Sequence, residues 1–319
     1  MPARHEFDEQ GYLDLYPDLA LGVARGVIES GWQHFTAHGF REGRQWIAQP
    51  DPLDGVCREI FPGDEMFLGN PDHYFEVGMS ALHCVETALF AARRQKACIK
   101  SILDLPCGHG RVMRFLKKAF PEARLTACDL NQSGVDFCVR MFGARPVLSR
   151  KEPAVIPLGD SFDLIWCGSL LTHLPEDKWT EFVHFFHRLL RPGGILLFTT
   201  HGRQCEADLA SGRNRYTLDD RQTAELIRQY RERGFGYVDY TGESGYGISL
   251  TRPSYISANF ALQPEWELLG FHESRWDGRQ DVFCLQRALV PHSPNPPLIP
   301  AVKAGENGRT LRGVGGVEG

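Results

Sequence analysis

Residues 101–118 read Ser101-Ile-Leu-Asp104-Leu-Pro-Cys-Gly108-His-Gly110-Arg-Val-Met-Arg-Phe-Leu-Lys-Lys. An apolar run comes first, a glycine turn follows it, and a helical pattern begins directly after the turn, which predicts a strand, a turn and a helix in one unbroken segment. Gly108 and Gly110 let the backbone turn sharply and approach a ligand closely, and the following helix presents free N–H groups to the same place. The segment therefore predicts a nucleotide-type pocket.

A second apolar run, 124–129, ends at Asp129. An acid at this distance from the glycine turn is the usual partner of a ribose diol in a βαβ unit. The segment differs from a dinucleotide-binding motif at two positions. Met113 stands where a third glycine is expected, and Asp104 precedes the turn. A carboxylate there repels a pyrophosphate but suits a ligand with a nucleoside end and a cationic end. S-adenosylmethionine is such a ligand, with a ribose, an ammonium and a sulfonium.

These residues resemble the first motif of the class I S-adenosylmethionine-dependent methyltransferase family, an acid-x-Gly-x-Gly-x-Gly pattern. The motif appears here as Asp104-Leu-Pro106-Cys-Gly108-His-Gly110, with proline in place of the first glycine. The likeness continues through 162–174 and 189–200, which look like the family's fourth and fifth strands, and it covers roughly residues 70–287. The resemblance implies an α/β fold, a doubly wound and mostly parallel seven-stranded sheet with a C-terminal antiparallel hairpin, and S-adenosyl-L-methionine as the cofactor.

The apolar patterns along the chain alternate between strands and helices. Strands are predicted at about 101–105, 124–129, 145–148, 161–167 and 194–200. Helices are predicted at about 72–97, 109–119, 132–142 and 176–190. This alternation predicts a parallel sheet with helices on both faces. A helix at 253–262 and strands at 266–273 and 282–286 complete the pattern, and the short link 274–281 predicts an antiparallel hairpin.

Changes in composition along the chain predict four regions: a helical module, a linker, a methyltransferase domain and a tail. Residues 1–48 predict short amphipathic helices punctuated by glycine, and they resemble a helical module that precedes sugar-modifying transferases in bacterial surface-glycan clusters. Prolines and glycines mark 49–71 as a linker, 72–290 is expected to be the cofactor-binding methyltransferase domain, and 291–319 is expected to be a disordered tail. The block 202–252, with a helix near 218–233, leaves from the ligand side of the sheet and predicts a lid or an acceptor-binding wall.

Charge and cysteine content narrow the function classes. The net charge is −5 and the basic residues are scattered, which argues against nucleic acid as the main partner. No apolar run approaches the roughly 20 residues of a membrane span, and the N-terminus lacks an apolar signal core, so the expectation is a cytoplasmic protein without a membrane partner. Nine cysteines without a Cys-x-x-Cys pair favour small buried hydrophobes over disulfides or zinc, and no metal is expected. His34 and His38 share a helix face but have no third ligand nearby, which favours packing or surface placement.

The expected cofactor contacts follow from the strand ends and the motif. Leu130 and Asn131 should border the adenosine, whereas Ser149 either touches the adenine or is an ordinary loop serine. Gly168 and Ser169 end the fourth strand, at the rim where the transferred methyl group would emerge. The full expected set is Asp104, Pro106, Gly108, Gly110, Asp129, Leu130, Asn131, Ser149, Gly168 and Ser169.

Two histidines are candidates for the catalytic base. His173 lies four residues after Ser169, and an imidazole with an ordinary pKa near 6.5 can take a proton from an acceptor hydroxyl. The alternative is that His173 packs beneath the cofactor or caps a helix. His201, just past the fifth strand, is the second candidate.

Other polar residues lie near the same rim. Tyr74 and Glu76 either close over the cofactor or have surface and packing roles. Asp277, Gln280 and Asp281 occupy the hairpin between the last two strands, where they either contact the acceptor or form a solvated turn.

These expectations favour a methyltransferase that acts by direct in-line transfer on an oxygen of a small molecule or glycan, with a nitrogen as the alternative acceptor atom. Positioning and removal of one proton are then the enzyme's main tasks. The sequence after the fourth strand, Cys167-Gly-Ser-Leu, lacks the Asn/Asp-Pro-Pro-Tyr/Phe tetrad expected of nucleic-acid amino-methylating enzymes. A catalytically inactive binding or scaffold protein is the alternative, and the intact glycine turn argues against it. Met113 and Asp104 disfavour a nicotinamide-dependent oxidoreductase.

Overall fold

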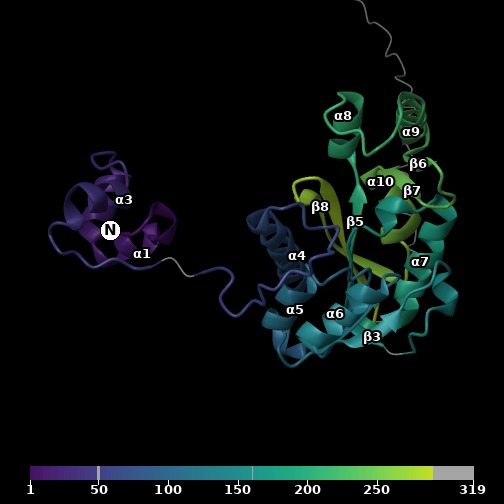
Figure 1. Ribbon diagram of the computed structural model, residues 1–319, viewed down its shortest axis with the longest axis horizontal. Coiled ribbons are helices and arrows are strands. Elements are labelled where there is room, and N and C mark those ends of the chain that lie inside the picture. The colour runs from purple at the N-terminus through teal and green to yellow at the C-terminus, as the bar shows by residue number, and fades with distance from the viewer. Residues whose placement is uncertain (49–50, 160, 290–319) are drawn as a thin grey trace, which may run out of the picture. The chain divides into compact units, whose positions relative to one another are not determined.

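A computed structural model describes residues 1–48, 51–159 and 161–289 (Figure 1). The described chain forms two compact units. The first consists of residues 1–158, 166–168 and 275–278, and the second consists of residues 159–165, 169–274 and 279–289. The expected tail, 291–319, lies outside the described residues.

The elements follow one another as helices and then alternating strands and helices. Up to residue 155 they are η1 (Arg4–Glu6), α1 (Glu9–Leu15), α2 (Pro17–Ala24), α3 (Gly31–His34), η2 (Phe35–Gly39), α4 (Pro71–Ala91), η3 (Lys96–Cys98), β1 (Ser101–Asp104), α5 (Met113–Ala119), β2 (Arg124–Asp129), α6 (Gln132–Phe142), β3 (Arg145–Leu148) and η4 (Pro153–Val155). The rest are β4 (Phe162–Cys167), η5 (Leu171–His173), α7 (Glu176–Leu189), β5 (Leu190–His201), α8 (Arg203–Ala210), α9 (Asp220–Arg233), β6 (Phe235–Asp239), β7 (Gly247–Thr251), α10 (Pro253–Ile256), η6 (Ser257–Ala261), β8 (Trp266–Trp276) and β9 (Gln280–Arg287).

The main sheet has seven strands in the order β3-β2-β1-β4-β5-β9-β8. Strands β1, β2 and β3 pair in parallel, while β9 pairs with β5 in antiparallel register, so that Thr200 faces Asp281 and His201 faces Gln280. Strands β1 and β4 are buried along their whole length, as strands covered on both faces must be. The expected doubly wound, mostly parallel sheet with a C-terminal antiparallel hairpin is confirmed.

Two predicted helix boundaries were wrong. Helix α5 begins at Met113 instead of residue 109, because Gly108 and Gly110 have φ values of 48° and 75°, which a right-handed helix does not allow. Helix α4 ends at Ala91 instead of residue 97, and Arg93 follows in the left-handed region with φ 53°.

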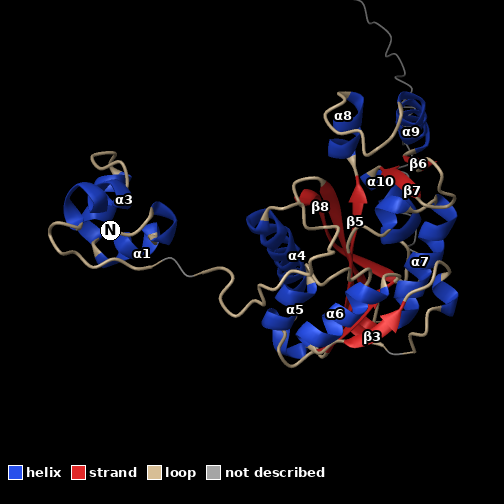
Figure 2. Ribbon diagram, viewed as in Figure 1, coloured by secondary structure: helices blue, strands red, loops and turns tan. Residues whose placement is uncertain are grey.

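The block 202–252 contains more regular structure than its sequence predicted. Its expected helix is α9, capped by Asp219 at the start and by Gly234, with φ 80°, at the end. Helix α8 and the antiparallel pair β6 and β7 were not predicted (Figure 2). These elements enclose their own hydrophobic cluster, which consists of Cys205, Leu209, Leu218, Leu226, Tyr230, Ile248 and Leu250.

Residues 1–48 contain the expected short helices around a cluster formed by Phe7, Tyr12, Leu19 and Phe35. The carboxylate of Glu9 accepts the N–H groups of Gly31 and Trp32 at the start of α3, at 2.5 and 3.2 Å. The ring centroids of His34 and His38 lie 5.7 Å apart. Across the described residues, no group of three His, Cys, Asp or Glu side chains is arranged to hold a metal ion.

All nine cysteines lie in the described part of the chain, where none forms a disulfide and seven are buried. Cys128, Cys138, Cys167 and Cys284 are among the buried ones, so the interpretation of these four as small hydrophobic residues is confirmed. Within the part of the chain that the structure describes, no helix is both long and apolar enough to cross a membrane.

Candidate cofactor site and catalytic histidines

Asp104 ends β1 directly before the glycine turn and is 2% exposed. Its Oδ2 atom has no hydrogen-bond partner. Burial, and then the charge of Asp129, raise the pKa of the Asp104 carboxyl well above its ordinary value. A buried carboxyl with an unfilled acceptor atom is costly unless a donor or a cation meets it. The ammonium of an amino-acid ligand is a fitting partner.

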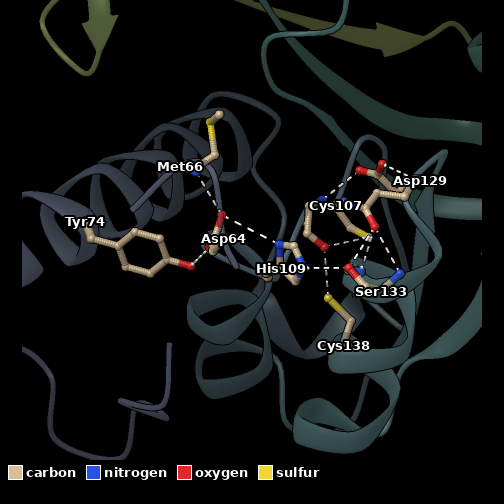
Figure 3. Close-up of polar contacts among 12 residues, drawn as sticks. Asp64, Met66, Tyr74, Cys107, His109, Asp129, Ser133 and Cys138 are labelled. Atoms are coloured by element: carbon tan, nitrogen blue, oxygen red, sulfur yellow. Dashed lines mark hydrogen bonds and ion pairs between the residues drawn. The ribbon is translucent and has the colours of Figure 1, made fainter. Parts of the chain in front are cut away.

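Asp129 ends β2 and connects to the glycine turn (Figure 3). Its Oδ2 accepts the N–H of Gly108 at 2.8 Å, and its Oδ1 accepts the N–H of Asn131 at 2.9 Å. Each carboxylate oxygen has two lone pairs, so one on each atom remains for a further donor. Two ribose hydroxyls are donors of the right number.

The two glycines of the turn have different surroundings. A Cβ atom placed on Gly108 would meet nothing within 4 Å, whereas one on Gly110 would overlap the ring of Phe142 and lie 3.2 Å from the Sγ of Cys138. The carbonyl of Gly108 packs against Gly134 of α6, where a Cβ would come within 2.5 Å of it. Gly108 therefore faces the open side of the turn, and Gly110 faces the protein interior.

The other residues expected to contact the cofactor differ in exposure and in their hydrogen-bond partners. Leu130 is 60% exposed beside Asp129, as an apolar border for an adenosine requires. Asn131 caps α6, since its side chain accepts the N–H groups of Ser133 and Gly134. Ser149 is buried and its hydroxyl hydrogen bonds with the thiol of Cys128. Neither of the last two side chains is free of a structural partner.

The segment 51–70, which we call the strap, contacts the glycine turn. The rings of Phe61 and His109 stack with centroids 4.4 Å apart, and His109 Nδ1 lies 3.7 Å from Asp64 Oδ1. Asp64 is buried and accepts the hydroxyl of Tyr74 at 2.6 Å (Figure 3). Tyr74 therefore has the packing role that was one of its two expected alternatives. Glu76 is exposed.

Buried Arg114 joins the strap to the turn. Its guanidinium donates to the carbonyls of Cys57 and Glu59 in the strap, at 2.9 and 3.0 Å, and to that of Gly110 at 3.1 Å. Sequence reasoning missed this contact because prolines and glycines suggested a linker. The apolar residues Leu53, Val56, Ile60 and Phe67, which pack beside α4 and α5, are the signal that could have revealed it.

Ser169, in the loop after β4, belongs to a closed set of polar contacts within the second unit. The N–H of Ser169 donates to Thr199 at 2.8 Å, Thr199 donates to Gln280 at 2.6 Å, and Gln280 donates back to Ser169 at 2.8 Å. Ser169 has a φ of 61°, which this cycle holds in place. Gln280 was expected in a hairpin turn, but its side chain instead fixes the loop after β4.

His173 lies in η5 and has a defined tautomer. Its Nδ1 is 2.8 Å from the carbonyl of Gly247, so Nδ1 carries the proton and Nε2 keeps its lone pair. The hydroxyl of Tyr240 lies 3.2 Å from the same Nδ1, and the ring of Tyr246 stacks on the imidazole with centroids 5.3 Å apart. Burial lowers the pKa of His173 below its ordinary value, which favours the neutral ring. A neutral imidazole with an available Nε2 is a proton acceptor.

His201 is a poorer candidate base. It is 4% exposed, its Nδ1 has no partner, and its ring lies 5.2 Å from that of Tyr216. Burial, followed by the nearby His173, lowers the pKa of His201 to about 3. Such a weak base accepts a proton inefficiently near neutral pH.

The two hairpin acids lie in different surroundings. Asp277 forms an ion pair with His73 at 3.4 Å. Asp281 is fully buried, accepts the N–H of Ser274 at 2.8 Å and packs directly on Gly202. Burial raises the pKa of Asp281 to about 6. A solvated turn was one of the two alternatives expected for Asp281, and its burial excludes that alternative.

Comparison with known proteins agrees with this geometry. Residues 102–194 match a family described as "Methyltransferase domain". Phthiotriol/phenolphthiotriol dimycocerosates methyltransferase 1 of Mycobacterium ulcerans is 31% identical over 57% of this chain and 64% of its own length. Malonyl-acyl-carrier protein O-methyltransferase of Halalkalibacterium halodurans is 30% identical over 32% of this chain and 40% of its own length.

A third relative, fatty-acid O-methyltransferase of Mycolicibacterium smegmatis, is 31% identical over 31% of this chain and 36% of its own length. The chain thus spans between 36% and 64% of the lengths of these relatives. The seven-stranded sheet and the glycine turn after β1 thus form a Rossmann-like fold, and residues 102–194 within it match a methyltransferase domain.

Proposed function

We propose that this chain transfers a methyl group from S-adenosylmethionine to an oxygen atom of a small-molecule acceptor. The match of residues 102–194 to a methyltransferase domain and the geometry of the glycine turn support the transfer. Within this proposal, Asp129 accepts the ribose hydroxyls, Gly108 lets the ligand approach the backbone, and Leu130 borders the adenosine. Asp104 accepts the ammonium of the methionine end with its unpartnered Oδ2.

The observation that carries the catalytic part of the proposal is the 2.8 Å contact between His173 Nδ1 and the Gly247 carbonyl. The contact fixes the tautomer, so that Nε2 takes the proton from the acceptor hydroxyl. The sulfonium of the cofactor supplies the methyl group together with its leaving group. What remains for the protein is to orient the acceptor and to remove one proton.

The insertion 202–252 is proposed to form the acceptor-binding wall. It supplies Tyr240 and Tyr246, whose rings lie 6.0 and 5.3 Å from that of His173. Aromatic rings bind both aliphatic chains and the apolar faces of sugars. The names of two relatives specify malonyl-acyl-carrier protein and fatty acids, and residues 1–48 resemble modules beside glycan-modifying transferases. Acyl compounds and saccharides are therefore the two acceptor classes to test first.

We propose a cytoplasmic location for this activity, because none of the nine cysteines, all in the described part of the chain, forms a disulfide, as is usual in a reducing compartment. The test is transfer of labelled methyl from S-adenosylmethionine to a panel of fatty acids, acyl-carrier conjugates and saccharides. Label in an ester or ether product, lost in His173→Ala, is the expected result. Cofactor binding without transfer to any acceptor, in the intact chain, would favour the scaffold alternative.

A further inference from the structure

Arg111 directly follows the glycine turn and has no role in the proposal above. Its guanidinium lies over the rings of Tyr74 and Trp276, at 6.0 and 5.6 Å from their centroids. Among the described residues, it makes neither a hydrogen bond nor an ion pair within 4.0 Å. Its side chain is only partly exposed. All five guanidinium donors are therefore left without a protein acceptor.

The neighbouring Arg114 shows what an arginine does here when its role is structural. Arg114 is 1% exposed and donates to the carbonyls of Cys57, Glu59 and Gly110. The guanidinium of Arg111 is partly exposed and has no such acceptors in the described part of the chain, so its donors are available to a ligand. The planar fork of arginine matches a carboxylate, which accepts two parallel hydrogen bonds.

The position of Arg111 selects one end of the cofactor. Trp276, beneath the guanidinium, also packs against Gly168, where a Cβ would lie 2.9 Å from the indole. Gly168 follows β4, and β4 adjoins β1 through the hydrogen bond from Leu105 N–H to the Trp166 carbonyl, at 3.1 Å. Arg111 therefore lies toward β4, whereas Asp129, the proposed ribose acceptor, ends β2 on the opposite side of β1.

The backbone of Arg111 is also held in place. Its carbonyl packs against Gly78 of α4, where a Cβ atom would overlap it. The indole N–H of Trp276 donates to the carbonyl of Val77 at 3.0 Å, which holds the ring in place under the guanidinium. Asp64 and Asp277 are the nearest acids, and both have other partners, Tyr74 and His73. The guanidinium is positioned in advance, with its donors unused.

We propose that Arg111 binds the carboxylate of the methionine end of S-adenosylmethionine, while Asp104 accepts the ammonium of the same amino acid. This inference rests on the proposed function. It adds a positively charged contact to the motif, which otherwise supplies only acids and backbone groups on that side of the turn.

Two ligands that differ in the amino acid alone test it. S-adenosylhomocysteine carries the carboxylate and the ammonium, and 5′-methylthioadenosine has the adenosine and the thioether but no amino acid. Calorimetric titration of the full-length protein with each ligand measures both affinities without any acceptor. The variants are Arg111→Met, which keeps an apolar stem over the rings, and Arg111→Lys, which keeps the charge and loses the fork. Arg140→Met is the matched control, since Arg140 also lies over a ring, that of Phe137, but is exposed.

In Arg111→Met, the affinity for S-adenosylhomocysteine should fall roughly ten- to a hundredfold, because a charged hydrogen-bonding group is lost. The affinity for 5′-methylthioadenosine should stay within about twofold, and Arg111→Lys should lie between wild type and Arg111→Met. Equal losses for both ligands, or no loss for either, would overturn the assignment of Arg111. Failure of the folded wild-type protein to bind either ligand would instead overturn the proposed function.

Discussion

The carboxylate of Asp129 accepts the N–H of Gly108 at 2.8 Å, so the acid that ends β2 and the glycine turn that follows β1 hold each other in place. The same carboxylate accepts the N–H of Asn131, the capping residue of α6. One side chain thereby connects two strand ends and a helix start. The carboxylate that is proposed to accept the ribose hydroxyls therefore also binds the backbone turn that is proposed to approach the ligand.

Replacement of Asp129 should therefore reduce cofactor affinity. In Asp129→Ala, we expect the affinity for S-adenosylhomocysteine to fall roughly ten- to a hundredfold, because hydrogen bonds to a charged group contribute about 1.5–3 kcal/mol. Calorimetry measures the change. Asp136→Ala is the control, since Asp136 is an exposed acid on α6 that accepts a hydrogen bond from Gln132 Nε2 at 2.7 Å. Wild-type affinity in folded Asp129→Ala would contradict the site.

Substitution of the two glycines of the turn should have different effects on stability and on cofactor affinity. Gly108→Ala places a methyl group in open space at a φ of 48°, so stability should drop by only about 1–2 kcal/mol while affinity drops more than about tenfold. Gly110→Ala drives a methyl group into Phe142 at a φ of 75°, which should cost roughly 2–4 kcal/mol of stability. Thermal unfolding and calorimetry on both variants separate the effects. Equal stabilities, with unchanged affinity in Gly108→Ala, would refute the distinction.

His173 should affect turnover and leave cofactor binding nearly unchanged. We expect His173→Ala to lower kcat about 10²–10⁴-fold with S-adenosylhomocysteine affinity within a few-fold of wild type. In the wild-type enzyme, activity should fall only below pH 6.5, because burial lowers the pKa of His173 and keeps Nε2 unprotonated to lower pH. The assay is a pH–rate profile of kcat on an identified acceptor.

His201→Ala is the informative comparison, because its pKa of about 3 makes it a weak base. Full activity in His173→Ala together with loss in folded His201→Ala would transfer the catalytic role to His201.

Asp281→Asn should stabilise the protein above pH 6. The folded-state pKa of Asp281 is about 6 and its ordinary value is 3.8, so the folded protein holds the proton between these pH values and carries a buried negative charge above them. The asparagine resembles the protonated acid and can still accept the Ser274 N–H. We expect the gain in unfolding free energy to be near zero below pH 4 and about 1–3 kcal/mol at pH 7.5. Chemical denaturation at both pH values measures it, and a gain that does not depend on pH would contradict this account.

The strap should detach when its anchor is removed. Arg114→Met leaves the carbonyls of Cys57 and Glu59 without their donor, and unfolding free energy should fall by about 3 kcal/mol or more. Trypsin should then cleave after Arg58 faster than in wild type. Arg140→Met, the exposed control, should change neither the stability nor the cleavage rate. Slow cleavage after Arg58 in Arg114→Met would show that the strap is held by other contacts.

Local sequence predicted the elements whose pattern is complete within a few residues. The buried run of β1 and the two glycines follow one another directly in the sequence, and the acid that ends β2 lies at the spacing typical of a βαβ unit, so they could be predicted together. The bounds of α6, Gln132–Phe142, agree with its apolar period and with the glycine that ends it. The glycine turn itself contradicted one helix boundary, because positive φ values at Gly108 and Gly110 delay the start of α5.

Contacts between distant segments could not be predicted in this way. The prolines and glycines of the strap predict a linker, whereas the guanidinium of Arg114 and the stack of Phe61 on His109 hold it on the turn. The state of His173 depends on the carbonyl of Gly247, which lies 74 residues away in an unpredicted strand. The proposal of His173 over His201 rests on the deeper burial of His201, which could not be read from the sequence alone.

Titration of the wild-type protein with S-adenosylmethionine and with S-adenosylhomocysteine tests the central claim most directly. The account predicts saturable binding of both ligands with one site per chain, and a loss of affinity in Asp129→Ala that is absent in Asp136→Ala. If the folded wild-type protein binds neither ligand, the glycine turn after β1 is not a cofactor site and the methyltransferase assignment fails.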